Sequence, residues 1–300
     1  MTRVVVIGDL MTDVVAQAEL ALARGSATPA RVHTYGGGSG ANVASWLGFC
    51  DIDVALIGRR GADINGRTRE MELMGYGIDA RMVMDQDRPT GTCVVMVTHK
   101  GQRTMLTDPA ANAAFSPEDI PADLFTQDAH LHVSGYTLLN EGSREAAQTA
   151  LDMARRAGMS VSVDGASASP LKRAGAESFL EWSQGAQLLF VDADEAEVLT
   201  GREEPGAAAK VLTAWYPQVV VKVGVEGALW CANGHTDPVS APAAPIDRNV
   251  DGTGAGDAFV AGFLPPWLVG KSAAEALTAG MQLASRAYAN IGARPDLGEG

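Results

Sequence analysis

The strongest constraint on the fold is a regular alternation of short apolar runs and helical segments along the chain. Apolar runs such as Val4–Ile7 and Leu188–Val191 are typical of strands buried on both faces. Arg144–Arg156, in contrast, repeats alanine and leucine with helical spacing. Strands separated by helices form a parallel sheet with right-handed crossovers, so the sequence predicts an α/β fold. The expected central strands are Val4–Ile7, Asp53–Gly58, Leu131–Val133, Ser160–Val163, Leu188–Val191 and Val219–Val223.

Two segments do not fit this sheet. Thr90–Thr98 and Arg103–Thr107 are rich in β-branched residues and predict a hairpin around residues 99–102. Residues 11–35 have an alternating, exposed character. Partly apolar faces on such segments must cover a site or a second subunit. We therefore expect one domain, 1–300, with a small β-sheet lid from about 11–36 and 90–108 and a homodimer formed through that lid.

Charge and cysteine content exclude several classes of protein. A net charge of −13 argues against a nucleic-acid partner or an anionic membrane surface. No apolar run approaches the ~20 residues of a membrane span. The cysteines at 50, 93 and 231 are few and far apart, so neither a disulfide framework nor a zinc site is indicated. We expect a cytoplasmic protein with neither nucleic-acid nor membrane partners.

Two pairs of polar residues have simple structural interpretations. His130 and His132 point to one face of a strand, which is the spacing of a metal pair, but no third ligand is evident nearby. Core or edge histidines are the favoured interpretation. Arg59 and Arg60 follow an apolar run and suggest a solvated loop.

The stretch 249–262, NVDGTGAGDAFVAG, changes from a glycine-rich loop into an apolar helix. Gly254, Ala255 and Gly256 carry almost no side chain, so their N–H groups can face an anion at the helix start. Asp257 follows at once, and a carboxylate there would repel an anion unless it has a chemical task. It can act as a base beside the anion site, or it can simply cap the helix. The loop alone leaves both interpretations open.

Two N-terminal segments carry candidate binding residues. Asp13 lies just past the first strand, where open α/β sheets bind ligands, and it can accept hydrogen bonds from sugar hydroxyls or cap a turn. Residues 36–42, GGGSGAN, satisfy the dinucleotide pattern GxGxxA, but they lie too far from the first strand to support it. A glycine hinge that leads into a helix is the better interpretation. Asn42 then lies in the first helical turn and can bind hydroxyls.

Polar residues also follow two later strands. Asp192 and Glu195 come after Leu188–Val191, where they can hold Mg²⁺ through water, cap the next helix, or do both. Lys222 ends the next strand and can reach a phosphate, while the glycines after it let backbone come close to a ligand.

Together these segments resemble the ribokinase-like, or PfkB, family of carbohydrate kinases over nearly the whole chain. The most specific elements are GGGSGAN at 36–42 and DGTGAGDAFVAGFL at 251–264. The resemblance implies a three-layer α/β/α fold and transfer of the ATP γ-phosphoryl group to a primary hydroxyl of a carbohydrate resembling ribose, fructose or ketogluconate. It also implies Mg²⁺ as a cofactor and allows K⁺ as another.

The resemblance assigns roles residue by residue. Asp257 matches the base, and the anion hole is formed by Gly254, Ala255 and Gly256. Positions that bind substrate hydroxyls are matched by Asp13, Gly38 and Asn42. Positions that line the nucleotide are matched by Lys222, Gly224 and Gly227. Glu195 and Asp192 match the Mg²⁺ segment, where contact is expected through water. Asp251 and the carbonyl of Thr253 match a monovalent-cation loop, which Gly292 and Ala293 are expected to close.

Several positions depart from the family pattern. Asp192 replaces the Asn of the N-x-x-E segment. Ser39 replaces a Lys of ribokinase, and Gly135 replaces its substrate-binding Glu, so ribose is the less secure acceptor. Pro265-Pro266 is expected to end the helix after Asp257 early.

Three alternatives remain at this point. A nucleoside kinase is possible if Tyr35, Phe115 or Tyr136 stacks on a base. A second alternative is a non-catalytic sugar-binding protein. The intact GAGD loop and the acidic pair Asp192 and Glu195 argue against it. A dehydrogenase is the weakest alternative.

Overall fold

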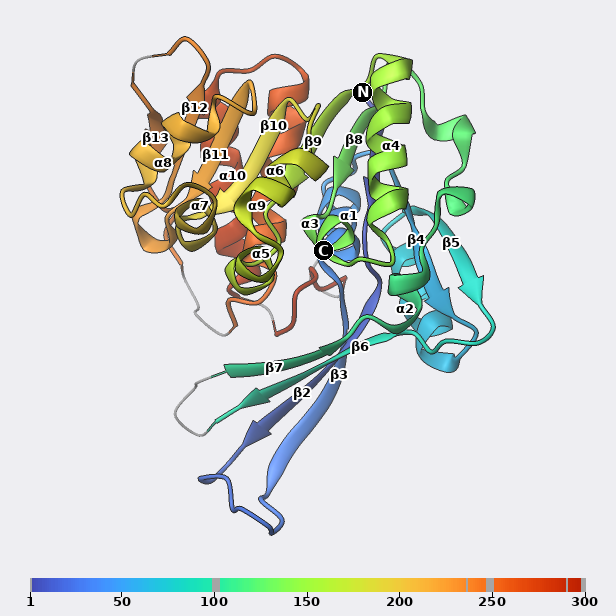
Figure 1. The fold of residues 1–300 in the computed structure, drawn as a ribbon. Coiled ribbons are helices and arrows are strands. Elements are labelled where there is room, and N and C mark those ends of the chain that lie inside the picture. Colours follow the sequence, from blue (N-terminus) through green and yellow to red (C-terminus); the bar gives the residue numbers. More distant parts are fainter. Residues whose placement is uncertain (1, 99–102, 236, 247–250, 290, 298–300) are drawn as a thin grey trace.

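A nine-stranded sheet forms the centre of the computed structural model, which describes residues 2–98, 103–235, 237–246, 251–289 and 291–297 (Figure 1). The strand order is β13-β12-β11-β10-β9-β8-β1-β4-β5. Strands from β11 to β5 pair in parallel, whereas β12 and β13 pair antiparallel at one edge. The bounds are β1 Val4–Ile7, β4 Val54–Gly61, β5 Asp79–Asp85, β8 His130–Val133, β9 Ser160–Asp164, β10 Leu188–Asp192, β11 Gln218–Lys222, β12 Ala228–Ala232 and β13 Val239–Ala241.

Helices cover both faces of this sheet, because alternate side chains of each buried strand point to opposite faces. Val4 and Val6 face one core and Val5 and Ile7 face the other. The first core is covered by α1 (Ser39–Phe49), α2 (Ile64–Gly75), α9 (Ala255–Leu268) and α10 (Ala273–Ala287). The second is covered by α4 (Arg144–Ala157), α5 (Ala168–Ala174), α6 (Ala176–Trp182), α7 (Ala193–Thr200) and α8 (Pro205–Leu212). The predicted three-layer α/β/α fold is confirmed.

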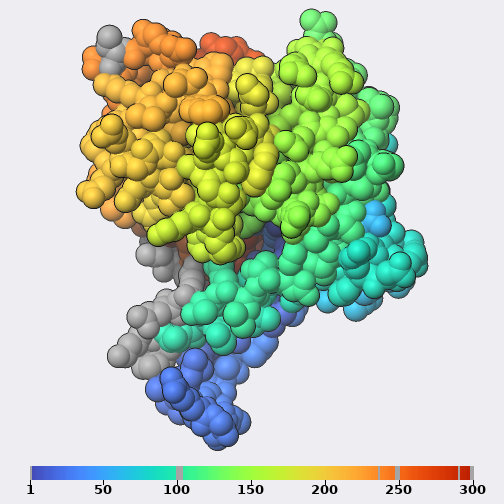
Figure 2. Space-filling view, in the orientation of Figure 1, coloured from blue at the N-terminus to red at the C-terminus, as the bar shows by residue number. Residues whose placement is uncertain are grey.

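A second, four-stranded sheet extends from the carboxyl ends of the central strands (Figures 1 and 2). Its order is β3-β2-β6-β7, with bounds Ala30–Gly37, Met11–Ala18, Gly91–Val97 and Arg103–Asp108. We call it the small sheet. Met11, Cys93 and Val95 form its own apolar cluster, and the expected turn at 99–102 lies outside the described residues. In the part of the chain that is described, no helix combines the length and apolar character needed to cross a membrane.

The helix that carries Asp257 does not end early. It continues through Pro265 and Pro266 to Leu268, contrary to the sequence prediction. The fixed φ of proline suits a helix, and the missing N–H donors fall in its last turn, where their loss disturbs little downstream structure.

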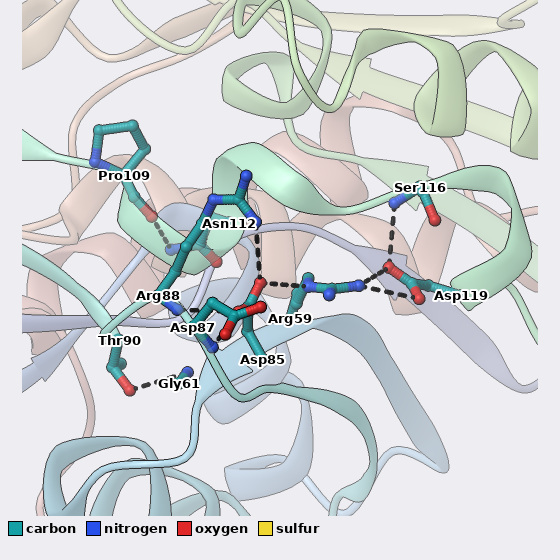
Figure 3. A network of polar contacts seen from close by, with 10 residues as sticks. All are labelled: Arg59, Gly61, Asp85, Asp87, Arg88, Thr90, Pro109, Asn112, Ser116 and Asp119. Atoms are coloured by element: carbon teal, nitrogen blue, oxygen red, sulfur yellow. Dashed lines mark hydrogen bonds and ion pairs between the residues drawn. The ribbon is translucent and has the colours of Figure 1, made fainter.

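Arg59 and Arg60 do not form a solvated loop. Strand β4 continues past its apolar run because Arg59 and Arg60 pair with β5. Nε of Arg59 donates to Asp85 at 3.0 Å, and Nη1 donates to Asp119 at 2.8 Å (Figure 3). Arg60 is buried and pairs with Glu70 at 2.6 Å. Buried carboxylate partners therefore compensate for taking these two cations out of water.

Candidate active site

The candidate residues gather at the carboxyl edge of the central sheet. Strand β10 ends at Asp192, its neighbour β9 ends at Asp164, and β8 ends just before Gly135. On the two sides of these strands, β11 ends at Lys222 and β1 ends just before Asp9. Parallel strands bring such ends to one edge, which is where ligands bind in open α/β sheets.

Asp257 lies in the first turn of α9 and is held from the GGGSGAN segment. Oγ of Ser39 donates to its Oδ1, and Nδ2 of Asn42 donates to its Oδ2, each at 2.8 Å. Burial raises the pKa of Asp257 to about 7, and Asp164 adds to this rise, whereas the two hydrogen bonds and Lys222 oppose it. A carboxyl group with a pKa near neutrality is suited to accept a proton from a hydroxyl group.

The start of α9 has the shape of an anion site. Gly254 precedes the helix with φ of 77°, and a Cβ there would collide with the carbonyl of Ala293, so glycine is required. At Gly256, a Cβ would lie 3.2 Å from Nζ of Lys222. The helix N-terminus and this ammonium group therefore present positive charge to the same place.

Asp13 and the glycine segment lie on the same side of the site as Ser39 and Asn42, which contact Asp257. Gly38 has φ of 94°, and a Cβ there would collide with the carbonyl of Asp9, so the chain can turn into α1 only with glycine. Asn42 follows in the first turn of α1, as expected. Asp13 comes from β2 and packs against the backbone of Gly37. Burial raises the pKa of Asp13 to about 6, although Arg294 opposes the rise.

Arg294 supports this segment from the C-terminal end of the chain. Its guanidinium is buried, and Nη2 donates to the carbonyl of Gly37 at 2.7 Å. Nη1 donates to Glu72 and Nε to Oδ1 of Asn42, each at 3.3 Å. Since Oδ1 of Asn42 accepts from Arg294, its NH₂ group faces Asp257. Arg294 therefore sets the orientation of the amide that contacts the base.

Acidic groups line the other side of the site. Asp192 and Glu195 form a capping box at the start of α7, with reciprocal hydrogen bonds of 2.8 and 2.9 Å. Burial raises the pKa of Glu195 to about 7, which Lys222 opposes and Asp192 reinforces. The described residues contain no group of three or more His, Cys, Asp or Glu side chains that could hold a metal directly. Asp192 and Glu195 supply oxygen donors, which is the ligand type that Mg²⁺ prefers.

The expected cation loop is closed by backbone and side-chain contacts. Oδ1 of Asp251 accepts from the amide and hydroxyl of Thr253, at 2.9 and 2.7 Å. Oδ2 accepts from the amide of Gly292 at 3.1 Å, and Nε1 of Trp46 donates to the carbonyl of Ala293. The loop that contains Gly254 is thus tied to the C-terminal segment next to the anion site.

The expected nucleotide residues follow β11. Gly224 begins a short 3₁₀ turn, Gly224–Glu226, and Gly227 closes it with φ of 108°. A Cβ at Gly227 would collide with the carbonyl of Ala241 in β13. Both glycines therefore allow the tight turn that follows Lys222, the last residue of β11.

The three aromatic candidates differ in position. Phe115 is only 3% exposed and belongs to the core, so its predicted stacking on a base is wrong. Tyr136 is 38% exposed and lies near the charges of Asp9, Asp164 and Asp257. The ring of Tyr35 packs at Gly292.

Sequence reasoning overlooked Asp164 and Arg294. Asp164 has the same signal as Asp192, because it is an acidic residue at the end of an apolar strand. Arg294 has no local signal, since its partners lie far away in the sequence. His130 and His132 lie in the core and are bonded to serines, which agrees with the favoured interpretation.

Known proteins show which family this chain resembles. Residues 1–298 match the model of the pfkB family of carbohydrate kinases. An ATP-dependent ribose-1-phosphate kinase from Halopiger xanaduensis is 31% identical over 272 residues, covering 89% of this chain and 86% of that protein. A fructokinase from Klebsiella pneumoniae is 33% identical over 241 residues, covering 76% and 75%. The structure of adenosine kinase from Sinorhizobium meliloti shares the fold, with a TM-score of 0.88, 23% identity and coverage of 98% and 96%. This chain therefore belongs to the PfkB family of carbohydrate kinases, phosphotransferases whose acceptor is an alcohol group.

Proposed function

We propose that this kinase uses Asp257 to take the proton from a primary hydroxyl of a sugar while ATP supplies the γ-phosphoryl group. The observation that carries the proposal is the position of Asp257, which is half-buried in the first turn of α9 and has a pKa raised to about 7. A base and an anion site must lie side by side for this transfer. ATP as donor is supported by the family and by the ATP-dependent relative.

The chemical step follows from these positions. Asp13, Gly38 and Asn42 bind hydroxyl groups of the sugar, and the oxygen of its primary hydroxyl attacks the γ-phosphorus as the bond to ADP breaks. Its proton passes to Asp257. Charge on the transferring group is stabilised by the amides at Gly254–Gly256 and by Lys222, so positioning and electrostatics supply most of the acceleration. Mg²⁺, held through water by Glu195 and Asp192, would supply further positive charge to the phosphate oxygens.

We infer that the small sheet acts as a lid on this site and that residues 1–300 work as one domain. Asp13 lies on β2, and the glycine segment begins with the last two residues of β3, so the sheet carries residues that we propose to bind substrate. The side chain of Asn112 holds the backbone of Leu10, the residue before β2. Its Oδ1 accepts from the amide of Leu10 and its Nδ2 donates to the carbonyl of Leu10, each at 3.0 Å.

The small sheet is also the proposed dimer surface. The strand register places Val32 and Leu106 on one face of this sheet, and both are large, exposed apolar side chains. Exposed apolar faces on a single sheet layer favour pairing with a second copy. A cytoplasmic location is consistent with the free thiols of Cys50, Cys93 and Cys231.

The acceptor is tested with a panel in an ADP-release assay, run with and without K⁺ and with Mg²⁺ removed by chelation. We expect turnover with a sugar and loss of turnover without Mg²⁺. Stimulation by K⁺ would assign the loop at Asp251 and Thr253 to a monovalent cation. Adenosine belongs in the panel because exposed Tyr136 near the site can stack on a base. No ADP release with any member would contradict the kinase assignment.

A further inference from the structure

A row of polar side chains crosses the apolar core between β8 and β9. His130 and His132 are fully buried, and the strand register sets them opposite Ser160 and Ser162. His130 contacts Ser160 through Nδ1 and Ser162 through Nε2, each at 2.8 Å. Nδ1 of His132 contacts the same Ser162 Oγ at 2.8 Å. Burying polar groups among apolar ones is costly unless every group is paired, so this row requires an explanation.

The row ends at the active site. Nε2 of His132 lies 3.4 Å from Oδ2 of Asp164, and neither atom has a hydrogen-bond partner among the described residues. Buried polar atoms are rarely left unpaired, so these two atoms, which lie near one another, are the natural donor and acceptor for each other. The other oxygen of Asp164, Oδ1, accepts from the amides of Gly135 and Ala166, at 3.1 and 2.8 Å.

The carboxylate gives the row one direction. An ionised Asp164 only accepts, so Nε2 of His132 carries the proton and Nδ1 is an acceptor. Ser162 must then donate to His132 and accept from Nε2 of His130. Nδ1 of His130 in turn accepts from Ser160. This arrangement pairs every donor in the row with an acceptor, and in it each histidine carries one ring proton, on Nε2.

We propose that His132 is a positioning residue for phosphoryl transfer, holding the Asp164 carboxylate in place at the head of a one-way hydrogen-bond chain through Ser162 and His130. This rests on the proposed function, because Asp164 is the carboxylate that ends β9, the strand between β10 and β8 at the candidate site. The charge of Asp164 acts on Asp257 and Glu195, and it attracts Lys222. Rotation of this carboxylate would disturb the electrostatics of the base and of the acidic side together.

Two isosteric variants separate positioning from structure. In His132→Gln, the side-chain amide takes the place of Nε2 and can still donate to Asp164. In His132→Asn, the shorter amide takes the place of Nδ1, so it can reach Ser162 but not Asp164. We expect His132→Gln to keep kcat within about threefold, and His132→Asn to lose about tenfold or more in kcat with KM for the sugar nearly unchanged. Equal kcat values in the two folded variants would overturn the proposal.

The direction of the chain is tested by ¹⁵N NMR of the histidine rings, which needs no activity. The wild type should show His130 and His132 as neutral Nε2–H tautomers. In Asp164→Asn, the amide oxygen must still accept from Gly135 and Ala166, so the NH₂ group faces His132. Both rings should then switch to Nδ1–H. An imidazolium at His132 in the wild type, or unchanged tautomers in Asp164→Asn, would overturn the chain. A correct NMR result without kinase turnover would contradict the proposed function alone.

Discussion

Asn42 donates its amide to Oδ2 of Asp257 over 2.8 Å, across a sequence separation of 215 residues. The family's two most specific motifs therefore meet at one carboxylate. Oγ of Ser39 donates to Oδ1, the other oxygen of the Asp257 carboxylate. The GGGSGAN segment and Asp257 therefore form a single hydrogen-bonded unit.

The pH dependence of kcat/KM should follow the ionisation of the acidic site residues. Burial raises the pKa of Asp257 to about 7, and the base works only after it has lost its proton. Activity should therefore fall as the pH drops below about 7 and reach a plateau above it, because kcat/KM reports the free enzyme. Glu195 titrates in the same range. Steady-state rates from pH 5.5 to 9 measure this; full activity at pH 5.5 would be inconsistent with a raised pKa.

Ser39→Ala should move that acid limb to higher pH. The hydroxyl stabilises the ionised form of Asp257, so its loss raises the pKa of the base further. The shift expected for one lost hydrogen bond is about half to one pH unit. Ser39→Thr keeps a hydroxyl and serves as the matched control. Identical profiles for the Ala variant and the wild type would show that Ser39 does not act on the base.

Arg294→Met should raise KM for the sugar about tenfold, which corresponds to one lost charged hydrogen bond. The substitution frees the Asn42 amide to turn and leaves Glu72 without this partner. It should also lower the free energy of unfolding by about 1–3 kcal/mol, because the carbonyl of Gly37 and Oδ1 of Asn42 lose their buried donor. Arg155→Met, at an exposed position of α4, is the control. Sugar titrations and denaturant unfolding measure the two effects, and an unchanged KM would count against the orienting role.

Leu106→Asp combined with Val32→Asp should give a monomer. Both side chains are 58% exposed on the small sheet, and a charge there opposes burial against a second copy. Met71→Asp, at an exposed apolar position on α2, is the control for added charge. Sedimentation at micromolar concentration decides: a monomeric wild type would rule out the lid dimer.

The sequence predicted the central sheet well because its strands are buried on both faces. Val4–Ile7 and Leu188–Val191 are continuous apolar runs, whereas β8 and β9 alternate histidine or serine with apolar residues and are buried as well. Strand β5 was not predicted, since it is half-exposed and mixes charged with apolar residues. Its pairing also explains why β4 continues through Arg59 and Arg60.

In the candidate site, too, some features have a local sequence signal and others do not. Local motifs pointed to Asp257, Asn42 and Glu195, because glycine loops and strand ends carry a sequence signal. The contact of Arg294 with Asn42 joins residues 252 positions apart, and that of Ser39 with Asp257 joins residues 218 apart. Such contacts follow from how distant elements pack, and no local pattern encodes them.

The most direct test of the account is the rate of ADP release by Asp257→Asn, measured at pH 8 with the best acceptor of the wild type. The variant keeps the shape of the side chain but cannot take a proton. We predict a loss of ~10²–10⁴ in kcat, the range of a general base, with retained ATP binding and a folded structure. Near-normal turnover by the folded Asp257→Asn protein would contradict the central claim.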